Sequence, residues 1–265
     1  MRAWRAGLVI GAFAAVLAAV GPAAPQAMPP QPVAASATTA VDLELVLAVD
    51  VSRSIDVDEF DLQRQGYARA IVNPSVLGAI KSGAIGAIAV TYVEWSGADQ
   101  QKTVVDWTLI RDAASAQLFA ASILAAPRSF AAYTSISGAI DYSIRLFETK
   151  RFEAQRQVID VSGDGSNNSG RPVSLARDAA IEGGITINGL TIINDRPNPF
   201  SRPEPKLDDY YRENVIGGAG AFVLIAEDFN SFAEAILSKL IKEVAGRPGE
   251  PPGVRLARAR WGSER

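Results

Sequence analysis

The segment LELVLAVDVSRSI (residues 43–55) decides the predicted fold. Its first seven residues form a short, predominantly apolar run, which Asp50 closes. Such a run is typical of a strand that is buried on both faces and ends at a polar loop. Residues 57–72 follow with apolar side chains at helical spacing and acidic residues in the first turn. A helix is therefore expected next, since acidic side chains favour the positive end of the helix dipole.

Two further apolar runs, at 85–95 and 103–110, read as strands. Only seven residues separate them. A parallel pair needs a crossover of about a dozen residues or more, so these two strands are expected to form an antiparallel hairpin.

The rest of the chain alternates between helical and strand patterns. We expect helices at 112–125, 135–148, 173–182 and 229–244, strands at 157–162, 186–193 and 222–226, and a short element at 207–213. This alternation predicts an α/β fold with a doubly wound, mainly parallel sheet, one antiparallel edge strand and helices on both faces. In such sheets ligands bind beyond the carboxyl ends of the strands, where the strand order reverses.

The sequence predicts one folded domain at 41–245, with both ends of the chain outside it. Residues 1–37 combine Arg2 and Arg5 with an apolar stretch of about 15 residues and a small-residue site, and this predicts a signal peptide. The alternative, an uncleaved membrane anchor, needs about 20 apolar residues. The protein is therefore expected to be periplasmic or secreted in a bacterium, and to meet the membrane only transiently through this segment. Residues 246–265 predict a disordered basic tail.

Composition excludes several classes of function. The chain of 265 residues has no cysteine and no histidine, which excludes disulfides, thiol or imidazole catalysis and the usual zinc sites. Any metal must therefore be held by oxygen ligands. With 26 basic and 29 acidic residues and a net charge of −3, the chain is not expected to bind nucleic acid, which requires a basic face.

Polar side chains occupy the positions where this fold would bind a ligand. Asp50, Ser52 and Ser54 come directly after the first strand, Asp164 follows a later strand, and Thr134 stands before a helix. Two carboxylates and three hydroxyls are the oxygen ligands that Mg²⁺ or Mn²⁺ prefers. Together these residues predict a divalent cation site.

Each of the three motifs also has a purely structural interpretation. Ser54 or Asp56 would serve as a helix N-cap, and Thr134 would cap the helix that follows it. Asp164-Gly165 would form a polar turn, because these residue types dominate turns for reasons of backbone conformation.

The motifs resemble the metal-ion-dependent adhesion site of the von Willebrand factor type A domain. In that pattern Asp50-x-Ser52-x-Ser54 comes first, then Thr134, then Asp164-Gly165. The segments LVLAVDVSRSID, TSISGAIDYS and VIDVSGDGSNN further resemble an exported bacterial family of type A-like proteins of unknown function. The resemblance implies a Rossmann-like von Willebrand factor type A fold.

The resemblance also implies roles for these residues. Ser52, Ser54 and Thr134 would contact the ion, and Asp50 and Asp164 would do so directly or through water. An Asp or Glu from a protein partner would take the remaining coordination position.

Three residues near the predicted site could affect how its carboxylates are held. The position before the third-loop aspartate, usually threonine in the family, is Gly163, so the support of Asp164 is expected to differ. Asp160 lies four residues before Asp164, so both side chains are expected on the same face of the strand. Asp160 would either support the metal site or be a structural or exposed residue of the strand. Arg128 reads either as orienting a carboxylate or as a surface arginine.

The sequence thus favours a non-enzymatic, divalent-cation-dependent protein-binding module. The first alternative is a Mg²⁺-dependent hydrolase or phosphoryl-transfer enzyme on the same fold. It is less supported, because Ser52 stands where a phosphatase of the haloacid dehalogenase type places its acidic proton donor. The second alternative is a structural α/β domain whose metal site is empty.

Overall fold

The computed structural model describes residues 38–149, 151–193, 204, 206–228 and 231–246. The predicted signal peptide at 1–37 and all of the predicted tail except Gly246 lie outside these residues. Within the part of the chain that is described, no helix is long and apolar enough to cross a membrane.

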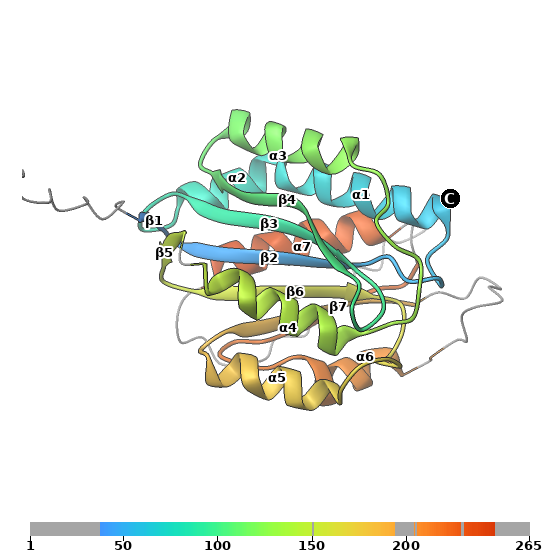
Figure 1. Cartoon of the computed structure of the whole chain (residues 1–265). Helices are drawn as coiled ribbons and strands as arrows, with labels where there is room; N and C mark the ends of the chain where they lie inside the picture. The colour runs from blue at the N-terminus through green and yellow to red at the C-terminus, as the bar shows by residue number, and fades with distance from the viewer. Residues whose placement is uncertain (1–37, 150, 194–203, 205, 229–230, 247–265) are drawn as a thin grey trace, which may run out of the picture. The chain divides into compact units, whose positions relative to one another are not determined.

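A six-stranded sheet runs through the middle of the domain (Figure 1). Its strands are β2 (Leu43–Asp50), β3 (Ile88–Trp95), β4 (Gln101–Ile110), β6 (Gln157–Gly163), β7 (Thr186–Ile192) and β8 (Val223–Ala226). Their order in the sheet is β4-β3-β2-β6-β7-β8. All neighbours pair in parallel except β3 and β4, which pair antiparallel. The predicted mainly parallel sheet with one antiparallel edge strand is therefore confirmed.

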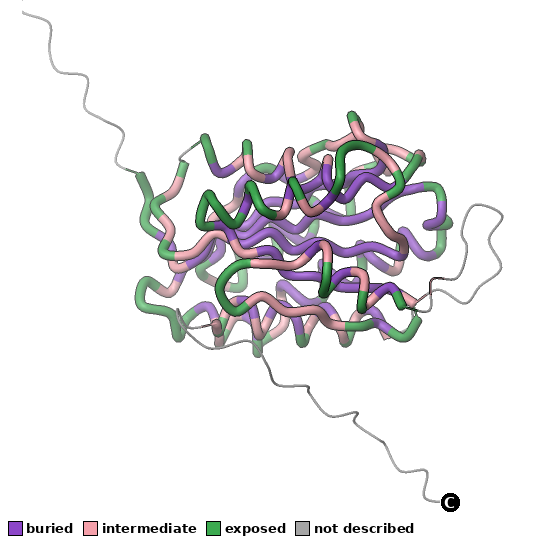
Figure 2. The backbone as a smooth tube through the Cα atoms, turned by 90° about the horizontal axis from the view of Figure 1, so that it is seen from below, coloured by how far each residue is buried: buried purple, intermediate pink, exposed green. Residues whose placement is uncertain are grey.

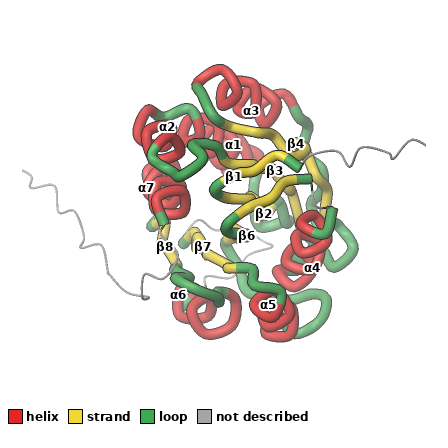
Figure 3. Tube along the Cα trace, turned by 90° about the vertical axis from the view of Figure 1, so that its left-hand side faces the viewer, coloured by secondary structure: helices red, strands yellow, loops and turns green. Residues whose placement is uncertain are grey.

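Helices cover both faces of this sheet (Figure 3). They are α1 (Val57–Ile71), α2 (Pro74–Lys81), α3 (Ala113–Ala125), α4 (Ile136–Phe147), α5 (Val173–Glu182), α6 (Leu207–Tyr210), the π-helical turn η1 (Tyr211–Val215) and α7 (Phe232–Ala245). Helices α1, α2, α3 and α7 contribute to one apolar core, and α4, α5, α6 and η1 to a second. The central strands are buried between them (Figure 2).

Side-chain alternation along β2 explains why the sheet has two cores. Leu45 and Leu47 belong to the core shared with α1, α3 and α7, whereas Val46 and Ala48 belong to the core shared with α4 and α5. Successive side chains of a strand point to opposite faces, so a strand between two helical layers must be apolar throughout. This is the physical reason for the apolar run before Asp50.

Several short elements differ from the sequence-based expectation. Helix α2 was not predicted; Asn73 caps it by accepting from Ser75 N at 2.9 Å, and a proline begins it. Strands β1 (Thr39–Val41) and β5 (Phe152–Ala154) pair with each other in parallel. Elements of three residues carry no usable periodicity, which is why the pattern missed them.

The start of β3 also differs from the expected strand at 85–95. The Asp42 carboxylate accepts from the backbone of Ile85 and Gly86, and Gly86 has a φ of 76°. This left-handed conformation suits glycine and breaks the extended chain, so the strand begins at Ile88.

The sheet reverses its strand order at β2, which pairs with β3 on one side and β6 on the other. The loops after β2 and β6 therefore leave the same edge of the sheet next to each other. This is the position at which an open parallel sheet binds ligands, and it holds Asp50 and Asp164.

Candidate metal centre

Three loops meet at this edge. We call residues 50–56 the first loop, 128–135 the second loop and 164–172 the third loop. In the first loop, Asp50 Oδ1 accepts from the Ser52 backbone N–H at 2.7 Å, which folds the chain back over the end of β2. The Ser52 and Ser54 hydroxyl oxygens lie 3.0 Å apart. Ser54 Oγ donates to Asp164 Oδ1 at 2.7 Å and so joins the first loop to the third.

The structure assigns the helix caps to residues other than Ser54 and Thr134. Asp56 caps α1 by accepting from Glu59 N at 2.8 Å, and Glu59 accepts in return from Asp56 N, which completes a capping box. Ser135 caps α4 by accepting from Gly138 N at 3.2 Å. The capping interpretation was therefore right for Asp56 and wrong for Ser54 and Thr134.

Thr134 lies in the second loop, facing the third. Its backbone N–H donates to Asn168 Oδ1 at 2.9 Å, and its carbonyl accepts from Asn168 N at 2.9 Å. Thr134 Oγ1 is 3.9 Å from the point that a Cβ would occupy on Gly165. The side chain is therefore buried next to the Asp164-Gly165 turn, where only 6% of Thr134 is exposed.

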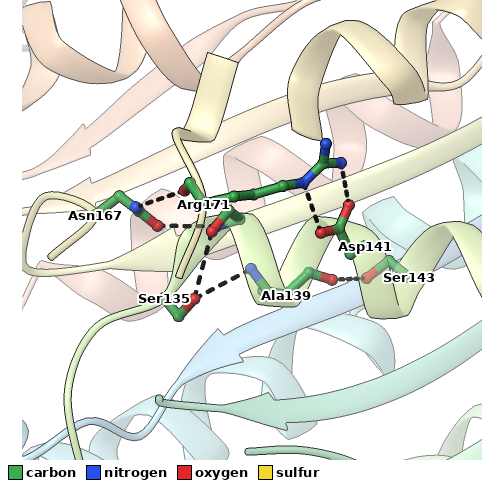
Figure 4. Close-up of polar contacts among 8 residues, drawn as sticks. Ser135, Ala139, Asp141, Ser143, Asn167 and Arg171 are labelled. Atoms are coloured by element: carbon green, nitrogen blue, oxygen red, sulfur yellow. Dashed lines mark hydrogen bonds and ion pairs between the residues drawn. The ribbon is translucent and has the colours of Figure 1, made fainter. Parts of the chain in front are cut away.

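Further polar contacts hold the third loop against α4 (Figure 4). Asn167 Oδ1 accepts from Ser137 N at 3.0 Å, and Asn167 Nδ2 donates to the Arg171 carbonyl at 3.2 Å. Arg171 forms a two-pronged ion pair with Asp141 of α4, at 2.9 and 2.5 Å. Each contact contributes little alone because the ion pair is partly exposed. Together they hold the third loop against the start of α4.

Two buried carboxylates at this site each have one oxygen without a hydrogen-bond partner. Among the described residues, Asp50 Oδ2 and Asp164 Oδ2 are buried and have no hydrogen-bond partner. Burial and the neighbouring Asp164 raise the pKa of Asp50 to about 8. Burial raises the pKa of Asp164 to about 6, and the Ser54 hydrogen bond opposes this rise. Buried carboxylates normally have a compensating charge or donor, so the site fits a hard divalent cation.

Hydroxyl oxygens are needed to complete such a site. In the described part of the chain, no group of three or more Asp, Glu, His or Cys side chains is placed to hold a metal ion. Two carboxylates from Asp50 and Asp164 with hydroxyls from Ser52, Ser54 and Thr134 make a set of oxygen donors that suits Mg²⁺ or Mn²⁺. The structure brings these five residues to one edge of the sheet; their binding of a metal stays a prediction.

Tyr211 is a residue of this site that sequence analysis missed. A Cβ on Gly163 would lie 2.9 Å from the Tyr211 hydroxyl oxygen and 3.0 Å from Asp50 Oδ2. The absence of a side chain at Gly163 thus lets Tyr211 of η1 approach Asp50. The hydroxyl is fully buried and has no hydrogen-bond partner among the described residues. It supplies a polar group at the place where the family carries a threonine.

Arg128 organises the first loop, which neither sequence interpretation of this residue anticipated. Its guanidinium is half-buried and donates to the backbone carbonyls of Val51, Ser52 and Ile55 at 2.8, 2.8 and 2.9 Å. Its Nε donates to the Phe130 carbonyl at 2.9 Å. Arg128 therefore positions carbonyl groups of the loop that carries Ser52 and Ser54.

We expect Arg128→Lys to weaken Mg²⁺ or Mn²⁺ binding by about 10-fold, because groups that orient metal ligands commonly contribute 10–100-fold to affinity. Lysine keeps the charge but cannot reach three carbonyls with a planar fork. Isothermal titration measures the effect. Arg151→Lys is the matched control, since Arg151 forms an exposed ion pair with Asp106 at 2.6 Å, away from the three loops. Equal affinities for Arg128→Lys and the control would contradict this role.

The cation-free protein is expected to lose stability as the pH rises. Asp50 and Asp164 have folded-state pKa values of about 8 and about 6, above the value of 3.8 for an unperturbed Asp. The folded state therefore binds more protons than the unfolded state, and the stability gained below pH 4 is lost progressively towards pH 8. Thermal unfolding in chelator between pH 5 and pH 8 measures this loss.

Mg²⁺ separates this effect from any due to Asp160, whose pKa, as long as its carboxyl is free, burial raises to about 7. The part of the loss that comes from Asp50 and Asp164 is expected to disappear in excess Mg²⁺, because the ion stabilises their charged forms. Two results would count against a cation between these carboxylates. One is a thermal midpoint that rises with pH in chelator, and the other is a pH-dependent fall of the midpoint that Mg²⁺ leaves unchanged.

Comparison with known families gives one match over most of the chain. A family model described as "Protein of unknown function (DUF1194)" matches residues 40–248. Among curated proteins, the sequence has no match.

Solved structures share the fold. A von Willebrand factor type A protein from Catenulispora acidiphila has a TM-score of 0.53 and 18% identity, covering 77% of this chain and 43% of that one. Proximal thread matrix protein 1 (PTMP1) from the mussel byssus has a TM-score of 0.58 and 11% identity, with 78% and 48% covered. A second PTMP1 structure, with a zinc occupied MIDAS motif, has a TM-score of 0.53 and 14% identity, with 78% and 49% covered. The pilus adhesin SpaC from Lactobacillus rhamnosus GG has a TM-score of 0.53 and 11% identity, with 78% and 32% covered.

The chain thus spans less than half the length of each of these proteins. At identities of 18% or less, the likeness concerns the fold alone. It confirms the Rossmann-like von Willebrand factor type A fold that the sequence motifs implied.

Proposed function

This chain belongs to the family described as "Protein of unknown function (DUF1194)", and we propose that it is an exported, divalent-cation-dependent protein-binding module. In this proposal Asp50, Ser52, Ser54, Thr134 and Asp164 hold Mg²⁺ or Mn²⁺. An Asp or Glu side chain of a protein partner completes the coordination. The module has no catalytic role.

The pair of unsatisfied buried carboxylate oxygens, Asp50 Oδ2 and Asp164 Oδ2, carries this proposal. Two carboxylates balance the charge of a divalent ion, while hydroxyl ligands add no charge. The ion consequently keeps enough electrophilic character to attract a further carboxylate. In this proposal the partner contacts the ion together with exposed residues of the three loops, such as Tyr133.

The similar structures support the cation and the type of partner. PTMP1 is a matrix protein that has been solved with zinc in its MIDAS motif, and SpaC is a pilus adhesin. These are properties of those proteins. For the present chain, the export signal at 1–37, the domain at 41–245, the tail at 246–265 and a periplasmic or secreted location remain part of the proposal.

Capture of a partner with and without chelator tests the function. The immobilised chain is incubated with bacterial envelope proteins in Mg²⁺, in Mn²⁺ and in EDTA. We expect capture of the same partner in either metal, loss in EDTA and recovery when the metal is restored. Asp164→Asn should fail to capture, whereas Asp106→Asn, at an exposed position on β4, should capture normally. Capture that persists in EDTA, or in Asp164→Asn, would refute the proposal.

The role of the partner's carboxylate has its own test. Conversion of the partner's Asp and Glu side chains to amides with carbodiimide and an amine is expected to abolish capture in Mg²⁺. The same treatment in the presence of the bound chain should protect the contacting carboxylate. Undiminished capture after complete amidation would show that another group of the partner makes the contact.

A further inference from the structure

A buried group of three charged side chains lies between β6 and α7, separate from the candidate metal centre. It consists of Asp160 of β6 with Lys239 and Glu243 of α7, and we call it the buried triad. At most 2% of any of these residues is exposed. Lys239 Nζ contacts Asp160 Oδ1, and it lies 2.5 Å from Glu243 Oε1. Asn188 Nδ2 also donates to Glu243 Oε1, at 3.0 Å.

The surroundings of the triad are largely apolar and leave acceptors unused. The Phe222 ring lies 5.5 Å from Lys239 Nζ. The Tyr67 hydroxyl, which is also buried, donates to Ser162 rather than to the triad. Asp160 Oδ2 and Glu243 Oε2 have no hydrogen-bond partner within the described residues, whereas Asp160 Oδ1 is in contact with Lys239 Nζ. Because burying uncompensated charge is costly, this arrangement favours loss of charge over an ordinary ion pair.

The charges of the triad do not balance. One amine stands against two carboxyl groups, so a buried proton on one of the acids lowers the net charge. Burial and the adjacent Glu243 carboxyl raise the pKa of Asp160 to about 7, while Lys239 opposes the rise. Glu243 Oε1 lies 2.5 Å from Lys239 Nζ, so it is placed to accept a proton from that nitrogen.

We propose that Lys239 and Asp160 condense to an intramolecular amide bond, with Glu243 as the proton carrier. The Lys239 nitrogen lone pair attacks Asp160 Cγ and forms the C–N bond. A C–O bond of the former carboxyl then breaks, and its oxygen leaves as water after receiving a proton from Glu243. Glu243 takes up a proton from the attacking nitrogen, so it ends the reaction unchanged. The balance is one amine and one carboxylic acid converted to one amide and one water.

The position of the triad makes this bond useful to the fold. It would tie the last helix to a central strand of the sheet, next to the strand β2 that precedes the first loop. A chain with no cysteine cannot make such a tie with a disulfide. The bond would also replace a buried ammonium and carboxylate by an uncharged amide, which removes the cost of keeping ions away from water.

Intact mass spectrometry of the purified full chain under denaturing conditions tests the proposal. Relative to the mass calculated from the observed N-terminus, we expect a loss of one water, about 18 Da. Tryptic digestion should yield a branched peptide in which Lys239 is joined to the peptide containing Asp160. Wild-type protein at its full calculated mass, folded and without a branched peptide, would overturn the proposal.

Three variants test which residues form the proposed amide bond. Lys239→Met and Glu243→Gln are expected to keep the full calculated mass. The former lacks the amine, and the latter lacks the proton carrier but keeps the shape of the side chain. Lys102→Met, at an exposed position of β4, should still show the loss of water. If the loss persisted in Lys239→Met, it would come from another residue and the proposal would be wrong. The mass readout requires no metal, so it is independent of the proposed function.

Discussion

Asp50→Asn is expected to abolish divalent cation binding and, in the absence of cation, to stabilise the folded protein. Loss of a residue that only supports a metal ligand costs 10–100-fold in affinity, so loss of a ligand should cost more than about 100-fold. The gain in stability in the absence of cation comes from removal of the same buried charge that would otherwise bind the cation. Asp50 is fully buried, and one of its oxygens has no partner among the described residues. An asparagine removes its negative charge from a site that lacks the cation.

Burial and Asp164 raise the pKa of Asp50 to about 8, so at pH 8 a large share of the cation-free folded protein carries this buried charge. Removing the charge is expected to stabilise the fold by roughly 2 kcal/mol, the order of the cost of an unsatisfied buried polar group. For a domain of this size, this corresponds to an increase of about 4–8 °C in the thermal midpoint in chelator. In excess Mg²⁺ the order should reverse, because the wild type gains binding energy that Asp50→Asn cannot gain.

Thermal unfolding in EDTA and in Mg²⁺, together with isothermal titration of each variant, measures both effects. Asp106→Asn is the control, since Asp106 lies at an exposed position on β4 and should change neither quantity appreciably. Unchanged cation affinity in Asp50→Asn would exclude Asp50 as a ligand. An absence of heat and of stabilisation with the wild type itself would favour the reading of the domain as a structural one with an empty site.

Lys239→Met should be among the most destabilising single substitutions in the domain. It removes the only cation in the buried triad and leaves Asp160 and Glu243 with their carboxyl groups adjacent. Removing one partner from a buried ion pair typically costs about 3–5 kcal/mol, equivalent to roughly 6–20 °C in the thermal midpoint at this size. The loss is expected whether Lys239 acts through an ion pair or through an amide bond, since the substitution removes either.

A second substitution at Asp160 tests the cause. In Lys239→Met/Asp160→Leu one of the two adjacent carboxyls is gone and an apolar side chain fills the space, while Glu243 keeps its hydrogen bond from Asn188, so part of the lost stability should return. Chemical denaturation of both variants beside the exposed control Lys102→Met provides the comparison. A Lys239→Met variant as stable as the control would mean that the triad contributes nothing to the fold, and an unrescued double variant would place the cost in packing.

The two groups of buried acids serve different purposes in the structure. Asp160 and Glu243 are in contact with an amine from the chain itself, Lys239, which links α7 to the sheet. Within the described residues, no Lys or Arg forms an ion pair with Asp50 or Asp164, and the nearby Arg128 donates to backbone carbonyls instead. On the proposed function, the absence of such an internal partner leaves Asp50 and Asp164 available for an external cation.

The sequence alone determined the layers of the fold and the residues of the candidate site. The apolar run before Asp50 predicted a strand covered on both faces, and the seven residues between two strands required an antiparallel hairpin. These signals are local, because strand periodicity and loop length depend on neighbouring residues. The polar residues after the strands were likewise visible, since parallel strands bring their carboxyl ends to one edge.

Only the tertiary structure decided what surrounds those residues. The Tyr211 hydroxyl and Asp50 both lie next to Gly163, which has no side chain to separate them. Arg128 donates to the first loop from the second loop, which lies far from it in sequence. Lys239 contacts Asp160 because α7 packs on the face of the sheet that carries the Asp160 side chain. No local pattern encodes such pairs: each depends on how helices pack on the sheet, and the same residue types in another packing would be exposed surface groups.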